Sequence, residues 1–237
     1  MSRPARTRTR RILGWLALAA LAVGAGAAVL VWRAPLRTAE LVGRYVLRAS
    51  GFERRQIEGP RGRIRYFVAG NGPVLAFVHG ANDQAGSWAR VAPAFTATHR
   101  VVVPDLAGHG ESAPADGPLV MADLVEGLAA VLRAEATPGP LVLVGSSLGG
   151  FLWLVHADRH RDDVRLVVAV NGAIMRGGNA EAAALLLPRT RNDARRVMEA
   201  LVSPKAPRIP DFVLDDLVSR ARVSPLSRLT NAPLSTV

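Results

Sequence analysis

A serine framed by glycines is the feature of this sequence best suited to chemistry. Residues 141–155 read LVLVGSSLGGFLWLV, an apolar run typical of a strand, then a turn of small residues, then an apolar run typical of a helix. The turn GSSLG at 145–149 matches G-x-S-x-G, a pattern that holds a serine hydroxyl on a sharp corner between a strand and a helix. Ser147 is therefore a candidate nucleophile.

A serine hydroxyl is a weak nucleophile at neutral pH and needs a base beside it. The last histidines of the sequence are His156 and His160, both on the helix expected after the turn. At ~1.5 Å per residue they lie about 13 and 20 Å along the helix from Ser147, too far to hydrogen-bond its hydroxyl. Two histidines at i and i+4 do not by themselves make a metal site, so we predict no metal. No G-x-G-x-x-G or Walker loop is present, and we predict no cofactor.

Two further motifs each follow an apolar run typical of a buried strand. His79-Gly80 ends the run PVLAFVHG at 73–80, and the loop DLAGHGES at 105–112 follows RVVVP. Strand-like and helix-like runs alternate around them, which predicts βαβ units and a parallel sheet. The expected strands are 62–70, 73–80, the first part of 100–112, 141–147 and 165–172, and the expected helices are 87–99, 121–136 and 148–160.

These three motifs occur in an order that resembles the α/β-hydrolase superfamily over about residues 56–222. A serine at the corner, where relatives that remove halide carry aspartate, implies hydrolysis of an ester, thioester, amide or carbon–carbon bond in a small acyl substrate. The resemblance implies these site residues: Ser147 as nucleophile, the backbone N–H groups of Ala81 and Leu148 as an oxyanion hole, and His79, Gly80, Asp105, His109, Gly145 and Gly149 as residues that shape the site.

In this family the acid and the base both follow the serine in chain order. The resemblance implies two more strands to carry them, and the sequence after 175–222 contains neither. We therefore expect a hydrolase truncated after its cap, with the strand at 165–170 left as an unpaired edge. Two alternatives remain open: a non-catalytic, membrane-tethered binding protein on the same fold, and a partner chain that supplies the missing strands.

An uncharged stretch near the N-terminus predicts a membrane anchor. Residues 12–32 contain 21 consecutive uncharged residues, enough to cross a bilayer as a helix, with Trp15 and Trp32 near the two ends. We favour this anchor over a cleaved signal peptide with Ala25-Gly26-Ala27 as its cleavage site. We expect a single-pass membrane protein with the basic segment 1–11 in the cytoplasm and the globular part on the extracytoplasmic side.

Charge and cysteine content narrow the possible partners. The formal net charge is +11, but residues 1–63 alone hold 13 arginines and 3 glutamates. The basicity therefore belongs to the membrane flanks, where arginine meets lipid headgroups, and we predict no nucleic-acid partner. The absence of cysteine excludes disulfides, thiolate metal sites and a cysteine nucleophile.

The expected organisation is a parallel-sheet α/β-hydrolase core with a small helical cap, preceded by a transmembrane helix. A basic amphipathic connector at 33–55 follows the span, and it could lie at the membrane surface or pack on the domain. The incomplete core occupies 56–174, the helical cap 175–222 and a tail 223–237.

Overall fold

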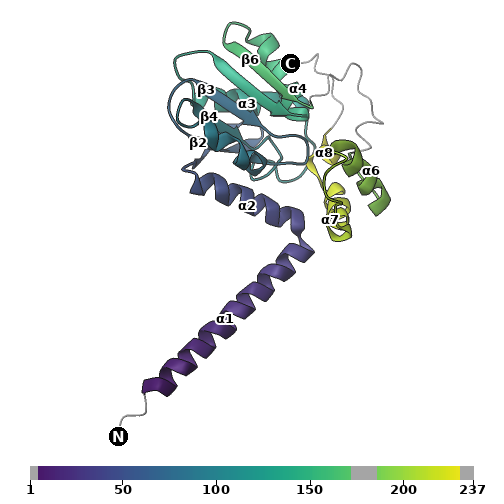
Figure 1. The fold of residues 1–237 in the computed structure, drawn as a ribbon. Helices are drawn as coiled ribbons and strands as arrows, with labels where there is room; N and C mark the ends of the chain where they lie inside the picture. Colours follow the sequence, from purple (N-terminus) through teal and green to yellow (C-terminus); the bar gives the residue numbers. More distant parts are fainter. Residues whose placement is uncertain (1–4, 172–185, 230–237) are drawn as a thin grey trace.

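The computed structural model describes residues 5–171 and 186–229. A six-stranded sheet in the order β1-β2-β4-β3-β5-β6 forms the centre of the domain (Figure 1). Its strands are β1 (Glu53–Gly59), β2 (Gly62–Ala69), β3 (Val74–Val78), β4 (Arg100–Pro104), β5 (Leu141–Ser146) and β6 (Val164–Val170). The helices are α1 (Ala5–Arg33), α2 (Pro35–Ala49), η1 (Ala85–Arg90), η2 (Ala92–Phe95), α3 (Met121–Ala134), α4 (Leu148–Arg159), α6 (Arg191–Leu201), α7 (Asp211–Ala221) and α8 (Pro225–Arg228).

The expected α/β fold with parallel strands is confirmed for one part of the sheet. Strands β4, β3, β5 and β6 pair in parallel, whereas β1–β2 and β2–β4 are antiparallel. Strand β1 was not predicted from the sequence. It forms a hairpin with β2 through the short turn at 60–61, and so short a connection allows only antiparallel pairing.

The sheet has an apolar core on each face, because alternate side chains of a strand point to opposite sides. In β3, Ala76 belongs to the cluster that packs against α3 and α4. Its neighbour Phe77 belongs to a second cluster with α2, η1 and η2 on the opposite face. Leu47 of α2 is fully buried in this second cluster, and Phe52 joins it just before β1. The segment expected as a connector thus contributes to the core.

The segment 87–99, expected as one helix, forms the two short 3₁₀ helices η1 and η2 instead. Pro93 lies in the first turn of η2. Proline lacks the N–H of an interior helical residue, and its ring clashes with the preceding turn, so a continuous α-helix cannot pass through it. Asp105, the first residue of the glycine loop at 105–112, accepts a hydrogen bond from the Ala85 N–H of η1 at 2.7 Å.

The segment 175–222, expected as a helical cap, contains α6 and α7 among its described residues. The helix-like stretch at 180–187 falls largely outside the described residues. Helix α7 packs against α2, where the Asp216 carboxylate accepts a hydrogen bond from the Leu36 N–H at 3.0 Å. The short helix α8 was not expected, and its Arg228 donates to the carbonyl of Gly108 at 2.9 Å. It therefore fastens the end of the described chain to the glycine loop.

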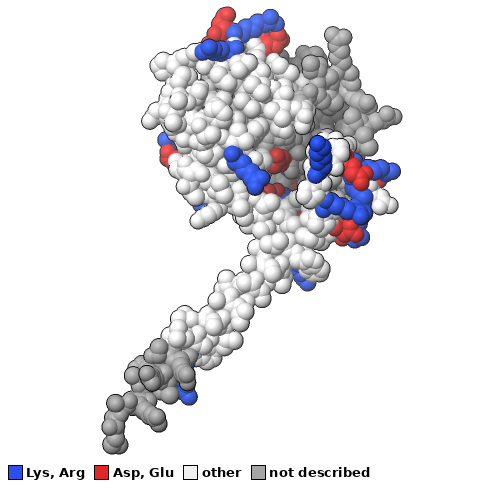
Figure 2. Space-filling view, viewed as in Figure 1, with Lys and Arg blue, Asp and Glu red and all other residues white. Residues whose placement is uncertain are grey.

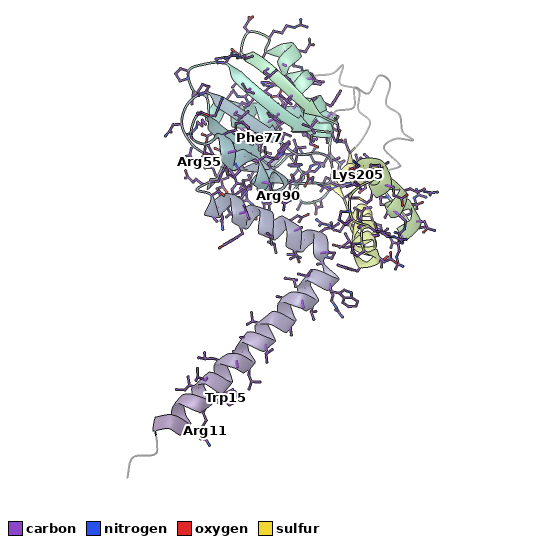
Figure 3. The ribbon with its side chains drawn as sticks, viewed as in Figure 1. Arg11, Trp15, Arg55, Phe77, Arg90 and Lys205 are labelled. Carbon is purple, nitrogen blue, oxygen red and sulfur yellow. The ribbon has the colours of Figure 1, made fainter. Side chains whose placement is uncertain are left out.

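Helix α1 projects away from the domain (Figure 1). Its stretch Arg11–Arg33 contains an 18-residue window with a mean hydropathy of 2.1, and none of that window is buried. Figure 2 shows it white along most of its length, and the side chain of Trp15 lies far from the domain in Figure 3. Length and composition are those of a helix that can cross a membrane.

A buried carboxylate holds the antiparallel side of the sheet to α3. Glu135, just after α3, accepts hydrogen bonds from the Tyr66 hydroxyl at 2.8 Å, the Arg55 Nη1 at 3.0 Å and the Arg100 Nε at 2.8 Å. Burial raises the pKa of Glu135, but the hydrogen bonds from Tyr66, Arg100 and Arg55 outweigh burial and leave this pKa below its ordinary value. The charged form is therefore the stabilising one.

We predict that Glu135→Gln lowers the free energy of unfolding by about 3 kcal/mol at pH 7, because two arginines lose a buried partner. The exposed Glu58→Gln should change it by less than about 0.5 kcal/mol. Because the pKa of Glu135 is lower in the folded state, its contribution is complete above about pH 4.5 and fades as the pH falls through the folded-state value. Urea unfolding of the three proteins at neutral and acidic pH measures both effects. Equal losses for both variants would contradict this account.

Candidate active site

Ser147 occupies the corner between β5 and α4, as the G-x-S-x-G pattern predicts. Its backbone has φ +48° and ψ −115°, outside the regions that residues with a side chain usually adopt. Two hydrogen bonds hold this strained turn: the Ser147 N–H donates to Val170 at 2.9 Å, and its carbonyl accepts from Phe151 at 3.1 Å. The side chain is half-buried at the carboxyl end of the parallel strands.

Glycines let three segments meet at this corner. A Cβ atom on Gly145 would lie 2.4 Å from the carbonyl carbon of Gly149, and one on Gly149 would lie 2.5 Å from the carbonyl oxygen of His79. Both distances are shorter than real side chains tolerate. The first turn of α4 therefore packs directly on the backbone of β5 and on the end of β3.

The loop after β3 passes over Ser147. A Cβ atom on Gly80 would lie 3.3 Å from the Cβ of Ser147, so this glycine leaves room for the serine side chain. Ala81 follows Gly80, and Leu148 begins α4. Because N–H groups in the first turn of a helix have no partner within it, such a site favours negative charge. Gly80, which precedes Ala81, and Leu148 thus both lie beside Ser147.

His79 is fully buried and connects two loops. Its Nε2 accepts a hydrogen bond from the Leu106 N–H at 3.1 Å, which places the ring proton on Nδ1. Nδ1 therefore donates to the carbonyl of Gly80 at 2.7 Å. With both nitrogens engaged, His79 positions the loop over Ser147 and is not available as a base.

Asp105 is the buried anchor of the loops around the site. Its Oδ1 accepts from the Ala85 N–H at 2.7 Å, and its Oδ2 accepts from the Glu111 N–H at 2.9 Å. Oδ2 also accepts from Arg44 of α2 at 2.9 Å. One carboxylate therefore joins η1, the glycine loop and α2.

Arg44 was missed as a site residue. It belongs to the basic connector expected at 33–55, and its side chain is only 11% exposed. It lies three residues before the buried Leu47, a spacing that places both on one face of α2. That spacing was the available signal.

His109 is buried beside His79, with ring centroids 5.4 Å apart. Burial above all, together with His79 and Arg228, lowers the pKa of His109 to about 3, against a hydrogen bond with Ala107 that raises it. His109 is therefore neutral at physiological pH and acts within the glycine loop as a packing residue.

The other three histidines lie away from the serine. His99 precedes β4 at the amino end of the parallel strands, opposite the end that carries Ser147. His156 and His160 stack 4.4 Å apart towards the far end of α4, and burial followed by His160 lowers the pKa of His156 to about 4. Within the described residues no histidine hydrogen-bonds Ser147, and no group of three side chains could ligate a metal ion.

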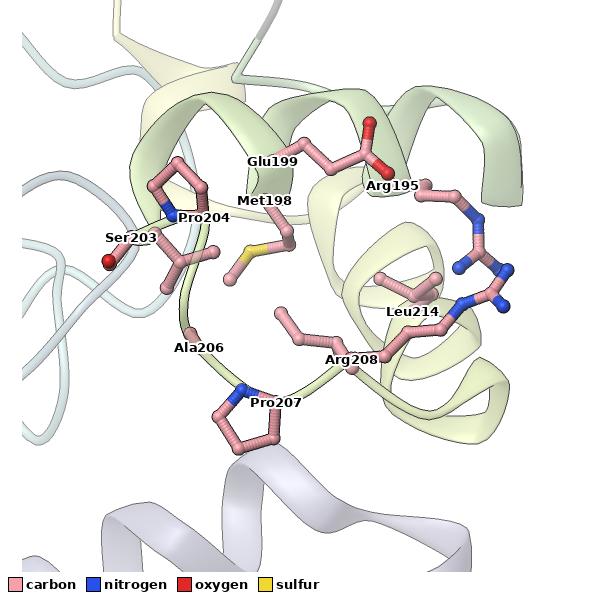
Figure 4. Close-up of a pocket in the computed structure, with 11 residues that line it drawn as sticks. Arg195, Met198, Glu199, Ser203, Pro204, Ala206, Pro207, Arg208 and Leu214 are labelled. Carbon is pink, nitrogen blue, oxygen red and sulfur yellow. The ribbon is translucent and has the colours of Figure 1, made fainter.

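Two cavities lie on the cap side of the domain. The larger, about 420 Å³, lies between α2, the loop after Ala81 and α7–α8. Its described lining is Leu36, Ala39, Glu40, Asn82, Asp83, Gln84, Gly86, Ser87, Leu186, Leu217, Arg220, Ala221, Val223, Ser224 and Pro225. The smaller, about 260 Å³, lies between α6 and α7 and includes Met198 and Leu214 (Figure 4). Only the larger cavity shares residues with the loop over Ser147.

Comparison with known proteins gives a consistent family. The sequence profile of the alpha/beta hydrolase fold matches residues 73–231. A pimeloyl-[acyl-carrier protein] methyl ester esterase from Vibrio atlanticus is 38% identical over 107 residues, 45% of this chain and 39% of the relative. A 2-hydroxy-6-oxo-6-(2'-aminophenyl)hexa-2,4-dienoic acid hydrolase from Metapseudomonas resinovorans is 26% identical over 127 residues, 52% of this chain and 44% of the relative. The chain thus spans less than half the length of either relative.

Solved structures show the same fold over a larger share of the chain. A membrane phospholipase A, described as a bacterial virulence factor, aligns with a TM-score of 0.62 at 25% identity. The alignment covers 92% of this chain and 72% of the phospholipase.

We predict that His109 stays neutral from pH 8 to pH 5 in the folded protein, because its pKa lies near 3. An NMR titration of the imidazole C–H signals, assigned with a His109→Gln variant, measures this. The same histidine in urea should titrate near 6.5, so its neutral form stabilises the fold, and this contribution fades as the pH falls from about 6.5 towards 3. A folded-state midpoint near 6.5 would rule out a buried, neutral ring.

Proposed function

Because the chain belongs to the alpha/beta hydrolase fold family, we propose that it is a membrane-anchored serine hydrolase that cleaves acyl bonds with Ser147 as nucleophile. The observation that carries the proposal is the left-handed backbone of Ser147 at the β5–α4 corner, with Gly80 against its side chain. A strained turn of this kind holds a hydroxyl out towards a substrate.

In the proposed reaction the Ser147 oxygen attacks the acyl carbonyl and forms a tetrahedral intermediate. The N–H groups of Ala81 and Leu148 stabilise the negative charge on the former carbonyl oxygen. The intermediate expels the alcohol, thiol, amine or carbon leaving group, and water then releases the acyl group from Ser147. A base takes the serine proton as the new bond forms and gives it to the leaving group as that group departs.

The names of the relatives support an acyl substrate. The matched Vibrio protein is an esterase, and the structure aligned over most of this chain is a membrane phospholipase A. The cavity of about 420 Å³ beside the loop after Ala81 is a candidate place for the acyl group. The apolar part of its lining, which includes Leu36 and Leu217, suits a hydrocarbon chain, and its polar part includes Asp83 and Arg220.

A specific observation favours a second candidate function. None of the five histidines of the sequence is placed to accept the proton of Ser147. A protein of this fold without a base could bind an acyl ligand without cleaving it. The alternative is therefore a membrane-tethered binding protein.

We predict that Ser147→Ala lowers kcat for p-nitrophenyl acyl esters by at least about three powers of ten, because the nucleophile is lost. Ser146→Ala is the matched control, since Ser146 lies in the same turn, and it should retain most of the activity. A fluorophosphonate probe should label the wild type and the Ser146 variant but not the Ser147 variant. Wild-type protein that binds acyl ligands without labelling or hydrolysis would establish the binding protein instead.

We further propose that α1 anchors the chain in a membrane, with the domain on the extracytoplasmic side. Arginines flank the span on both sides, and none of its apolar surface is buried within the described residues. A hydrocarbon environment would cover this surface.

Wild-type protein should stay in the membrane pellet after alkaline carbonate extraction. Leu21→Arg with Val23→Arg should release it, because each arginine at the centre of a span costs ~2.5–3.5 kcal/mol on insertion. Leu21→Ala with Val23→Ala is the conservative control and should remain in the pellet. Release of the wild type, or a mature N-terminus just after Ala27, would refute the anchor.

A further inference from the structure

We propose that the outer face of α2 binds the surface of an anionic lipid bilayer. This outer face consists of Arg37, Leu41, Val42, Tyr45 and Arg48. The proposal rests on the membrane anchoring proposed above and does not depend on the identity of the nucleophile.

The inner face of α2 is fixed to the domain. A Cβ atom on Gly43 would lie 2.5 Å from the carbonyl oxygen of Gly86, so the helix packs backbone to backbone on η1. Leu47 is fully buried, and Arg44 binds Asp105 in the interior. The helix cannot rotate without breaking these contacts, so its orientation on the domain is set.

The outer face exposes large apolar side chains. Leu41 is 53% exposed, Val42 55% and Tyr45 71%. Positions 37, 41, 45 and 48 recur at helical spacing and therefore form one continuous strip. An exposed apolar strip on a packed helix marks a place where another surface binds.

The charge on this strip points to anionic lipid. Arg37 and Arg48 are exposed, and no ion pair holds either one within the described residues. The only acidic residue of α2, Glu40, is bound by Arg220 of α7. Apolar side chains flanked by free arginines are typical of helices that lie in the headgroup region.

The position of α2 in the chain selects a bilayer over a protein partner. Helix α1 ends at Arg33 and α2 begins at Pro35, so only one residue separates the proposed span from the strip. Figure 1 shows α2 along the side of the domain from which α1 projects. If α1 spans a bilayer, the surface of that bilayer therefore lies next to the start of α2.

This contact would also set the position of the site. Helix α2 carries Arg44, whose partner Asp105 anchors the loops around Ser147. It also lines the 420 Å³ cavity with Leu36 and Ala39. The proposed membrane contact therefore holds the cavity close to the lipid surface, where acyl substrates that partition into the bilayer are concentrated.

Because the chain contains no cysteine, a single cysteine introduced by mutation can be labelled specifically. Full-length Tyr45→Cys, Asp162→Cys and Leu21→Cys proteins are labelled with bimane and reconstituted in vesicles of phosphatidylcholine and phosphatidylglycerol. Nitroxides on lipid headgroups or on acyl chains then quench the label according to its depth. Asp162 is the matched aqueous control, because it is exposed on the turn between α4 and β6, away from α2 (Figure 1).

We expect headgroup quenching at position 45 to be at least about threefold stronger than at 162, because interfacial helices lie ~5–10 Å into the headgroup boundary. Position 21 should be quenched by the acyl-chain nitroxide. Equal quenching at 45 and 162, with position 21 quenched, would overturn the α2 proposal and leave the anchor standing. A label at position 21 that is not quenched would overturn both the α2 proposal and the membrane anchor. Ester hydrolysis is measured in a separate assay, so failure of either membrane proposal is distinguished from failure of Ser147 as nucleophile.

A second set of variants tests the charge without touching the core. Arg37→Gln with Arg48→Gln, in the labelled Tyr45→Cys protein, should reduce headgroup quenching roughly twofold or more on anionic vesicles. Arg161→Gln with Arg165→Gln, exposed near the control position, should leave it unchanged. Quenching that is insensitive to Arg37 and Arg48 would overturn the assignment to anionic lipid.

Discussion

The arrangement of the site depends on one buried carboxylate. Asp105 receives the N–H groups of Ala85 and Glu111 and the guanidinium of Arg44, so three segments far apart in sequence end on the same two oxygen atoms. A buried carboxylate that lost these partners would carry an uncompensated charge, at a cost of several kcal/mol. The position of η1, and with it the loop over Ser147, is therefore tied to the position of α2.

A second constraint is the absence of side chains at the corner. The first turn of α4 contacts the backbone of β3 and β5 through Gly145 and Gly149, where any Cβ would clash. Such close contact allows Ser147 to keep a φ of +48°, because the surrounding backbone leaves no room for a relaxed turn. The close backbone contacts of Gly145 and Gly149 thus fix the turn between β5 and α4. This turn places the Ser147 side chain beside Gly80, in the loop after β3.

The elements that the sequence predicted well are those with apolar periodicity. Strands β2 to β5 and helices α3 and α4 were predicted, since each buries apolar side chains that recur with the period of its element. Strand β6 was predicted from its apolar run, although Leu166, Val168 and Val170 are exposed at the edge of the sheet. Strand β1 was missed because ERRQIEG is polar, and only Ile57 packs on the core. Arg44 was missed as a buried residue: its spacing from Leu47 indicated the inner face of α2, but its partner Asp105 is 61 residues away, and no local pattern identifies that ion pair. Short-range patterns predict elements, whereas buried polar contacts emerge only from the tertiary structure.

The junction between α1 and α2 limits how the domain can move relative to the proposed anchor. Ala34 donates to Leu30 at 2.9 Å, and its own carbonyl accepts from the Thr38 N–H at 2.9 Å, so backbone hydrogen bonds continue across the break between the helices. A flexible linker would let an anchored domain sample many heights and orientations, because its reach grows with its length. Here a single residue separates the proposed span from a helix that is packed on the core. For a chain anchored as proposed, the approach of a substrate to Ser147 is therefore decided by the packing of α2 on the domain.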